Sequence, residues 1–119
     1  MTTLKVGIAT FEQYKTRTMA IAQGQYVPSH DEPKVWFQSL ESFARVLSDK
    51  NRTLLSLIVR MQPTSVRELA EKTGRAESNL SRTLKTLESH GLVHFEKGLG
   101  RQRVPHVNYS GVALEMSFQ

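Results

Sequence analysis

The period of the apolar residues changes several times along the chain, and each change marks a predicted element. Residues 4–8 alternate between apolar and other side chains, which is typical of a short strand. Thr10 and Gln13 have the spacing of a capping box, which predicts that a helix begins there. The polar stretch 25–33, with two prolines, predicts a linker. We therefore expect residues 1–33 to form an N-terminal strand-helix arm with its linker.

The middle of the chain has mainly helical periodicity. Residues 34–38 predict a second short strand, and Ser39 is expected to cap a helix whose apolar residues recur at helical spacing as far as Leu47. Asp49 is expected to cap the next helix, which Pro63 ends. Because that helix is apolar on more than one side, it is predicted to be the most buried one.

Two further predicted helices are joined by a tight turn that contains a glycine. Ser65 and Glu68 form a second capping box, and Gly74 occupies a position that favours the left-handed conformation after a helix. A longer helix is expected over 76–90. Its inward face carries three leucines: Leu80, Leu84 and Leu87.

After Gly91 the apolar period becomes two. Residues 92–97 and 104–109 predict a hairpin around the turn at 98–100. Residues 112–118 alternate without a break, which predicts a strand near the C-terminus. The expected fold class is therefore α+β.

The two helices around Gly74 have the layout of a helix-turn-helix, and the hairpin that follows them has the place of a wing. The runs 65–75 (SVRELAEKTGR) and 79–93 (NLSRTLKTLESHGLV) resemble winged helix-turn-helix proteins of the MarR/ArsR type. The resemblance covers about two-thirds of the chain. It implies a DNA-binding domain over 34–119.

The resemblance implies that helix 76–90 reads the major groove and that wing 92–109 contacts the DNA backbone or the minor groove. The outward face of that helix carries cations, hydroxyls and an amide but no acid. Such groups can bind base edges and phosphates. Residues expected to contact bases and nearby phosphates are Ser78, Asn79, Arg82 and Lys85. Residues expected mainly to hold the backbone are Arg75, Ser81, Thr86, Lys97, Arg101 and Arg103.

The start of the predicted recognition helix departs from the usual pattern. Ala76 stands where relatives commonly have a capping hydroxyl or Asp, and Arg75 stands at a position that is often apolar. Two explanations stay open. Either the helix begins at a different residue, or Arg75 and the free helix N–H groups meet a phosphate.

Composition and charge agree with a nucleic-acid partner and exclude several other classes. The formal net charge is +5, and there is no cysteine, which excludes disulfide scaffolds, thiol chemistry and cysteine-based zinc sites. No apolar run reaches the roughly 20 residues of a membrane span, and no signal peptide is visible. We expect a cytoplasmic protein without catalytic activity, cofactor or metal, since the four histidines are scattered and no nucleophile motif is present.

A single recognition helix reads few base pairs, so we expect a homodimer that represses transcription from two half-sites. Residues 1–47 or the C-terminal strand should form the dimer or partner contacts. The whole layout also resembles small prokaryotic DNA-binding proteins, some of which are antitoxins. An antitoxin that binds a cognate toxin and regulates its own operon is therefore an alternative, as is a winged-helix module for RNA or protein contacts.

Overall fold

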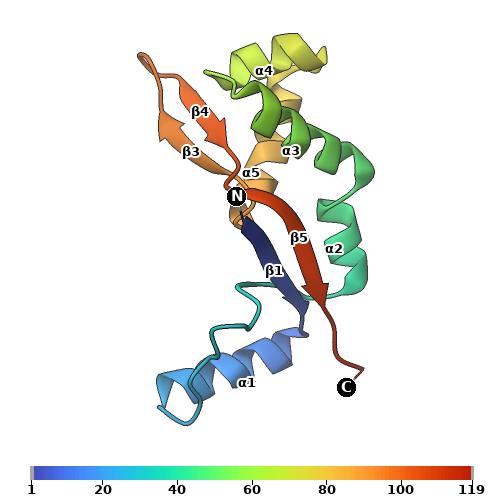
Figure 1. Cartoon of the computed structure of the whole chain (residues 1–119), viewed down its shortest axis with the longest axis vertical. Helices are drawn as coiled ribbons and strands as arrows, with labels where there is room; N and C mark the ends of the chain where they lie inside the picture. The colour runs from blue at the N-terminus through green and yellow to red at the C-terminus, as the bar shows by residue number, and fades with distance from the viewer. Residues whose placement is uncertain (1, 119) are drawn as a thin grey trace. The chain divides into compact units, whose positions relative to one another are not determined.

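The computed structural model describes residues 2–118 and has an α+β fold (Figure 1). Each predicted helix and strand is present, with some ends shifted. The elements in chain order are β1 (Thr2–Ile8), α1 (Phe11–Ala22), β2 (Val35–Phe37), α2 (Leu40–Val46), α3 (Asp49–Met61), α4 (Val66–Thr73), α5 (Glu77–Ser89), β3 (His94–Lys97), β4 (Arg103–His106) and β5 (Tyr109–Glu115).

The chain divides into two compact units. The first contains the residues up to Arg45 together with those from Tyr109 onward, and the second is Val46–Asn108. This division differs from the expected boundary after residue 33, because β2 and β5 both pair with β1. Strand pairing therefore assigns the second strand and the C-terminal strand to the N-terminal unit.

The sheet of the first unit has the strand order β2-β1-β5, and both neighbours run parallel to β1. Leu4 pairs with Val112, and Val6 pairs with Val35 and Leu114. Parallel neighbours need a crossover connection, which α1 provides between β1 and β2. The stretch 25–33 therefore does not separate an arm from the rest of the chain, because it returns the chain to the same sheet.

Arg17 attaches α1 to the rest of the first unit. No side chain of α1 is buried. The Arg17 guanidinium is 2.8 Å from a carboxylate oxygen of Glu32, and its central carbon lies 5.2 Å from the ring centre of Trp36 and 5.9 Å from that of Tyr26. These are the distances of cation–π contacts. The Trp36 ring lies directly over Gly7, where a Cβ atom would come within 2.6 Å of the ring.

The core of the second unit is centred on α4 and α5. Leu69 of α4 and Leu80, Leu84 and Leu87 of α5 are completely buried, and the two helices contact each other. The expectation that α3 would be the most buried helix is wrong: only Leu54 and Ile58 of that helix are buried. The reason is that its other apolar residues lie on sides that no neighbouring element covers fully.

Helix ends follow the capping pattern, with one shift. Thr10, Ser39 and Ser65 cap their helices as predicted, each accepting a hydrogen bond from a backbone N–H three residues later. The capping box is complete at Thr10, whose N–H donates to the Gln13 side chain. The second predicted box is wrong in one half, because the Glu68 carboxylate accepts from the N–H and the hydroxyl of Thr64 instead of the Ser65 N–H. The predicted cap of α3 is wrong by one residue. Ser48 accepts the hydrogen bond from the Asn51 N–H at 3.2 Å, and Asp49 lies in the first turn.

The hairpin is antiparallel, with His94 opposite His106 and Lys97 opposite Arg103. Its turn is closed by the Gly98 N–H, which donates to the Gln102 carbonyl at 2.9 Å. The strand near the C-terminus begins earlier than predicted and ends at Glu115, so residues 116–118 lie beyond its paired part. Within residues 2–118, no helix has both the length and the apolar character needed to cross a membrane.

Replacing Leu84 with alanine should lower the free energy of unfolding by about 2–5 kcal/mol, because the change leaves a cavity in a fully buried core. Urea unfolding followed by circular dichroism measures this difference. The neighbouring exposed change Lys85→Ala is the matched control and should stay within about 0.5 kcal/mol of the unchanged protein. Equal effects of the two changes would contradict the assigned inward face of α5.

The Arg17 hydrogen bond lowers the pKa of Glu32 below the ordinary glutamate value. Because the pKa is lowered in the folded state, the pair stabilises the fold above the unfolded-state pKa, and this contribution is lost as the pH falls through the lowered value. Arg17→Gln should therefore move the pKa of Glu32 back toward the ordinary value in a carboxyl NMR titration. Lys15→Gln, an exposed change on the same helix, should leave the Glu32 titration unchanged.

Candidate nucleic-acid interface

The turn between α4 and α5 sets the direction of the second helix. Gly74 adopts the left-handed conformation, with φ of 70°, and its N–H donates to the Ala70 carbonyl at 2.9 Å. A residue with a side chain is strained in that conformation, which explains the glycine. Helix α5 begins at Glu77 after Ala76, which makes no side-chain capping bond. The sequence predicted that this helix has no side-chain cap, and the structure confirms that prediction.

The burial of one face of α5 determines which side chains point outward. Three leucines are completely buried, and the helix exposes all six of its predicted DNA-contacting residues. Glu77 and Glu88 are the acidic residues of this helix. The six exposed residues are Ser78, Asn79, Ser81, Arg82, Lys85 and Thr86.

Arg75 lies along the first turns of α5. Its Nε and Nη2 atoms donate to Asn79 Oδ1 at 3.1 and 2.7 Å, and Nη2 also reaches Thr83 Oγ1 at 3.3 Å. Two predicted contact residues are therefore hydrogen-bonded to each other. Sequence reasoning missed Thr83, although the i, i+4, i+8 spacing of these residues could have indicated it.

Four of the predicted cations have no partner within residues 2–118. No ion pair and no hydrogen bond joins their own side chains to another described residue, although the Arg82 backbone carbonyl accepts from the Thr86 hydroxyl at 3.2 Å. Two stand on the outward face of α5 and two at the hairpin turn, and all four are exposed. Unpaired exposed cations attract anions without first breaking an internal bond. These residues are Arg82, Lys85, Lys97 and Arg101.

Arg103 differs from the other hairpin cations because it is held internally. Its guanidinium carbon lies 4.1 Å from the ring centre of Phe95, and Nη2 is 3.7 Å from a carboxylate oxygen of Glu88. Since Glu88 belongs to α5 and Phe95 to β3, Arg103 connects the hairpin to the helix. Sequence reasoning expected Arg103 to hold DNA and missed both of its partners.

Two histidines that were expected to be scattered lie together on the hairpin. The rings of His94 and His106 stack, with centres 5.2 Å apart and an interplanar angle of 19°, and each Nε2 atom is 3.3 Å from a different oxygen of Glu96. The hairpin register brings the two histidines together, because His94 of β3 lies directly opposite His106 of β4. Within residues 2–118, no group of three or more His, Cys, Asp or Glu side chains is placed to hold a metal ion.

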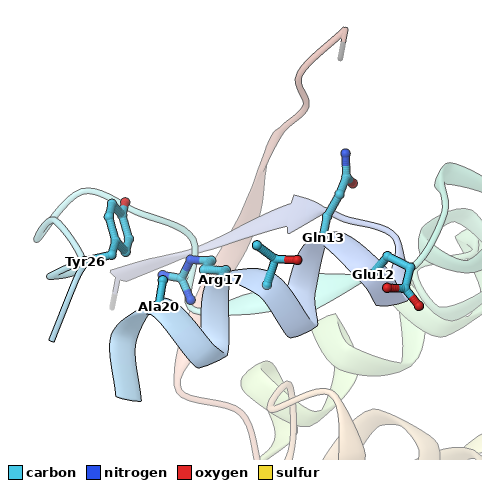
Figure 2. Close-up of a pocket in the computed structure, with 6 residues that line it drawn as sticks. Glu12, Gln13, Arg17, Ala20 and Tyr26 are labelled. Atoms are coloured by element: carbon cyan, nitrogen blue, oxygen red, sulfur yellow. The ribbon is translucent and has the colours of Figure 1, made fainter. Parts of the chain in front are cut away.

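A pocket lies beside α1 in the first unit (Figure 2). Its volume is about 540 Å³, and it is open to solvent. Arg17 is the cation that lines it, and this side chain is already paired with Glu32 and stacked on two aromatic rings. The pocket therefore has no unpaired cation among its lining residues that could bind an anionic ligand. Its lining residues are Glu12, Gln13, Thr16, Arg17, Ala20 and Tyr26.

Comparison with known proteins assigns the chain to a family. A family model described as HVO_A0114 matches residues 46–114, which is more than half of the chain. The chain belongs to the HVO_A0114 family. The match includes the whole second unit and nearly all of β5, so every candidate contact residue lies within the part that defines an HVO_A0114 protein. No curated protein matches the chain.

Replacing Arg103 with alanine should loosen the hairpin, because the change removes both the cation–π contact with Phe95 and the ion pair with Glu88. Hydrogen exchange at the Gly98 and Gln102 amides should become faster. The matched control is Arg101→Ala, which removes a cation of the same turn that has no partner within residues 2–118. If both changes accelerate exchange equally, Arg103 does not hold the hairpin.

Proposed function

We propose that this HVO_A0114-family protein is a sequence-specific double-stranded DNA-binding transcriptional regulator, and that residues 46–108 act as its winged helix-turn-helix. The observation that carries the proposal is the outward face of α5, which bears Arg82 and Lys85, two exposed cations whose side chains have no partner within residues 2–118. The exposed acids of the helix, Glu77 and Glu88, lie toward the edges of this face, nearer the buried leucines. The resemblance of residues 65–93 to MarR/ArsR-type proteins points to the same helix.

The dimensions of α5 suit the major groove of DNA. Its 13 residues make a helix of about 20 Å, and the groove is about 12 Å wide, enough to admit an α-helix. In this arrangement Arg82 and Lys85 reach base edges and nearby phosphates. Arg can bind guanine through two hydrogen bonds, which gives base preference as well as affinity.

The hairpin supplies the second contact. Lys97 and Arg101 flank its turn without partners within residues 2–118, so they can neutralise phosphates or enter the minor groove. Arg103 acts as a positioning residue that keeps the hairpin beside α5 through Glu88 and Phe95. This division of roles refines the expectation that all three hairpin cations bind DNA directly.

DNA suits this face better than single-stranded RNA or a protein partner. The outward face of α5 has no aromatic residue on which an unpaired base could stack. It also has no exposed large apolar residue to anchor a protein. We propose that the protein binds as a homodimer to two half-sites and represses transcription by occupying them.

The test is a titration of the purified full chain against the DNA upstream of its own gene at several salt concentrations. Random duplex DNA and single-stranded RNA serve as competitors. A tight, salt-dependent complex that survives both competitors supports the proposal. Equal binding to every nucleic acid would contradict sequence-specific recognition, and displacement by RNA alone would favour an RNA-binding module.

Two substitutions separate base reading from backbone binding. Arg82→Ala should weaken binding to the preferred site by about 1–3 kcal/mol and relax the base preference at one position. Arg101→Ala should weaken binding to all sequences alike and reduce the salt slope by about 1. Lys50→Ala, an exposed lysine of α3 outside the proposed interface, is the control and should change neither quantity.

A further inference from the structure

Strand β5 is an edge of the three-stranded sheet. The strand order β2-β1-β5 leaves one side of β5 without a neighbouring strand in the described chain. The other edge strand, β2, has only three residues, whereas β5 has seven. The longer of the two unpaired edges therefore belongs to β5.

The side chains of β5 continue the apolar core of the first unit into solvent. Val112 and Leu114 pair with the buried residues Leu4 and Val6, so all four lie on the same face of the sheet. Leu114 is 36% exposed, and two exposed apolar residues follow the strand: Met116, which is 47% exposed, and Phe118, which is fully exposed. An apolar stripe that leaves a buried core along an open edge is typical of a surface covered in an assembly.

The edge also lacks the features that usually prevent strands from pairing. Residues 109–118 contain no proline, lysine or arginine. The single charged residue in this segment is Glu115, whose carboxylate is 3.7 Å from the Lys5 ammonium on β1. This ion pair partly neutralises Glu115. Two copies of the strand can then approach with little electrostatic repulsion.

We infer that β5 pairs antiparallel with β5 of a second copy of this chain, which joins the two three-stranded sheets into one six-stranded sheet. Because the two-fold axis is perpendicular to the sheet, corresponding faces of the two three-stranded sheets lie on the same side of the joined sheet. Val112 and Leu114 of both copies then lie on the same face of the joined sheet. Antiparallel pairing about such an axis gives each copy the same contacts, as a closed dimer requires.

A second copy fits this edge better than an unrelated strand, because the proposed function needs the same symmetry. Two recognition helices that read two half-sites must be related by a two-fold axis, and β5 pairing supplies one. The inference therefore rests on the proposed function for its choice of partner. Its structural basis, the open apolar edge, is independent of DNA binding.

The first test measures the mass of the full chain without DNA by sedimentation equilibrium. The unchanged protein should be a dimer. Leu114→Lys and Met116→Lys should each raise the dimer dissociation constant by about tenfold or more, because they place a charge in the apolar edge strand or directly after it. Met116 lies beyond the paired part of β5, so that variant tests the edge even if Leu114→Lys fails to fold.

The matched control is Val27→Lys, which adds the same charge at another exposed apolar residue, 82% exposed and outside the sheet. This variant should remain dimeric. A monomeric unchanged protein would overturn the inference, and so would a dimer that both Leu114→Lys and Met116→Lys leave intact.

A cysteine scan locates the two-fold axis. The chain contains no cysteine, so single cysteines introduced at positions 109–115 crosslink without background. A residue beside the two-fold axis lies opposite the same residue of the second copy. The distance between their Cβ atoms is that of a cross-strand pair, which is close to the Cβ–Cβ distance in a disulfide. Crosslinking should therefore peak at one or two neighbouring positions and decrease on both sides. Val27→Cys, outside the sheet, gives the background crosslinking yield. Yields at all positions 109–115 that do not exceed this background would overturn antiparallel β5 pairing.

The same variants separate this inference from the proposed function. A monomeric Met116→Lys variant should bind a half-site duplex normally but lose tight binding to the full site. If the protein dimerises through β5 but binds no DNA, the interface stands and the regulatory function fails. If the protein binds DNA while Leu114→Lys and Met116→Lys leave the dimer intact, only the interface is wrong.

Discussion

The burial of one face of α5 is the constraint on which the rest of the second unit depends. Leu80, Leu84 and Leu87 are completely buried, as is Leu69 of the contacting helix α4. Once these leucines point inward, the helical period leaves Arg82 and Lys85 no orientation except outward. The polar face proposed to read DNA is thus held by apolar packing. The side chains that bind need no stabilising contacts of their own.

The cations of the proposed interface have two distinct roles, and their internal partners distinguish them. Arg75 and Arg103 are bonded to neighbouring side chains, so they order the start of α5 and the hairpin. Arg82, Lys85, Lys97 and Arg101 have no such partner within residues 2–118. The first set positions the surface, and the second is available to a polyanion. The proposed interface therefore needs both sets.

The first unit is held together in a different way, by pairing strands from the two ends of the described chain. Strand β1 lies between β2 and β5, and α1 is attached through the stacked Arg17 side chain rather than through a buried face. Of the ten large apolar residues that are exposed within residues 2–118, nine belong to this unit. This apolar surface includes the proposed dimer interface, and the second unit carries the proposed nucleic-acid interface.

The sequence by itself determined the local elements and the outward face of α5. Capping residues, glycine turns and apolar periods act over a few residues, so Thr10, Ser39, Ser65 and Gly74 could be assigned without tertiary information. Tertiary structure decided which distant segments meet. The pairing of β1 with β5, the stacking of His94 on His106 and the attachment of Arg103 to Glu88 all join residues separated in the chain. Periodicity shows that a side is apolar but not which element covers it, because that depends on how the whole chain packs.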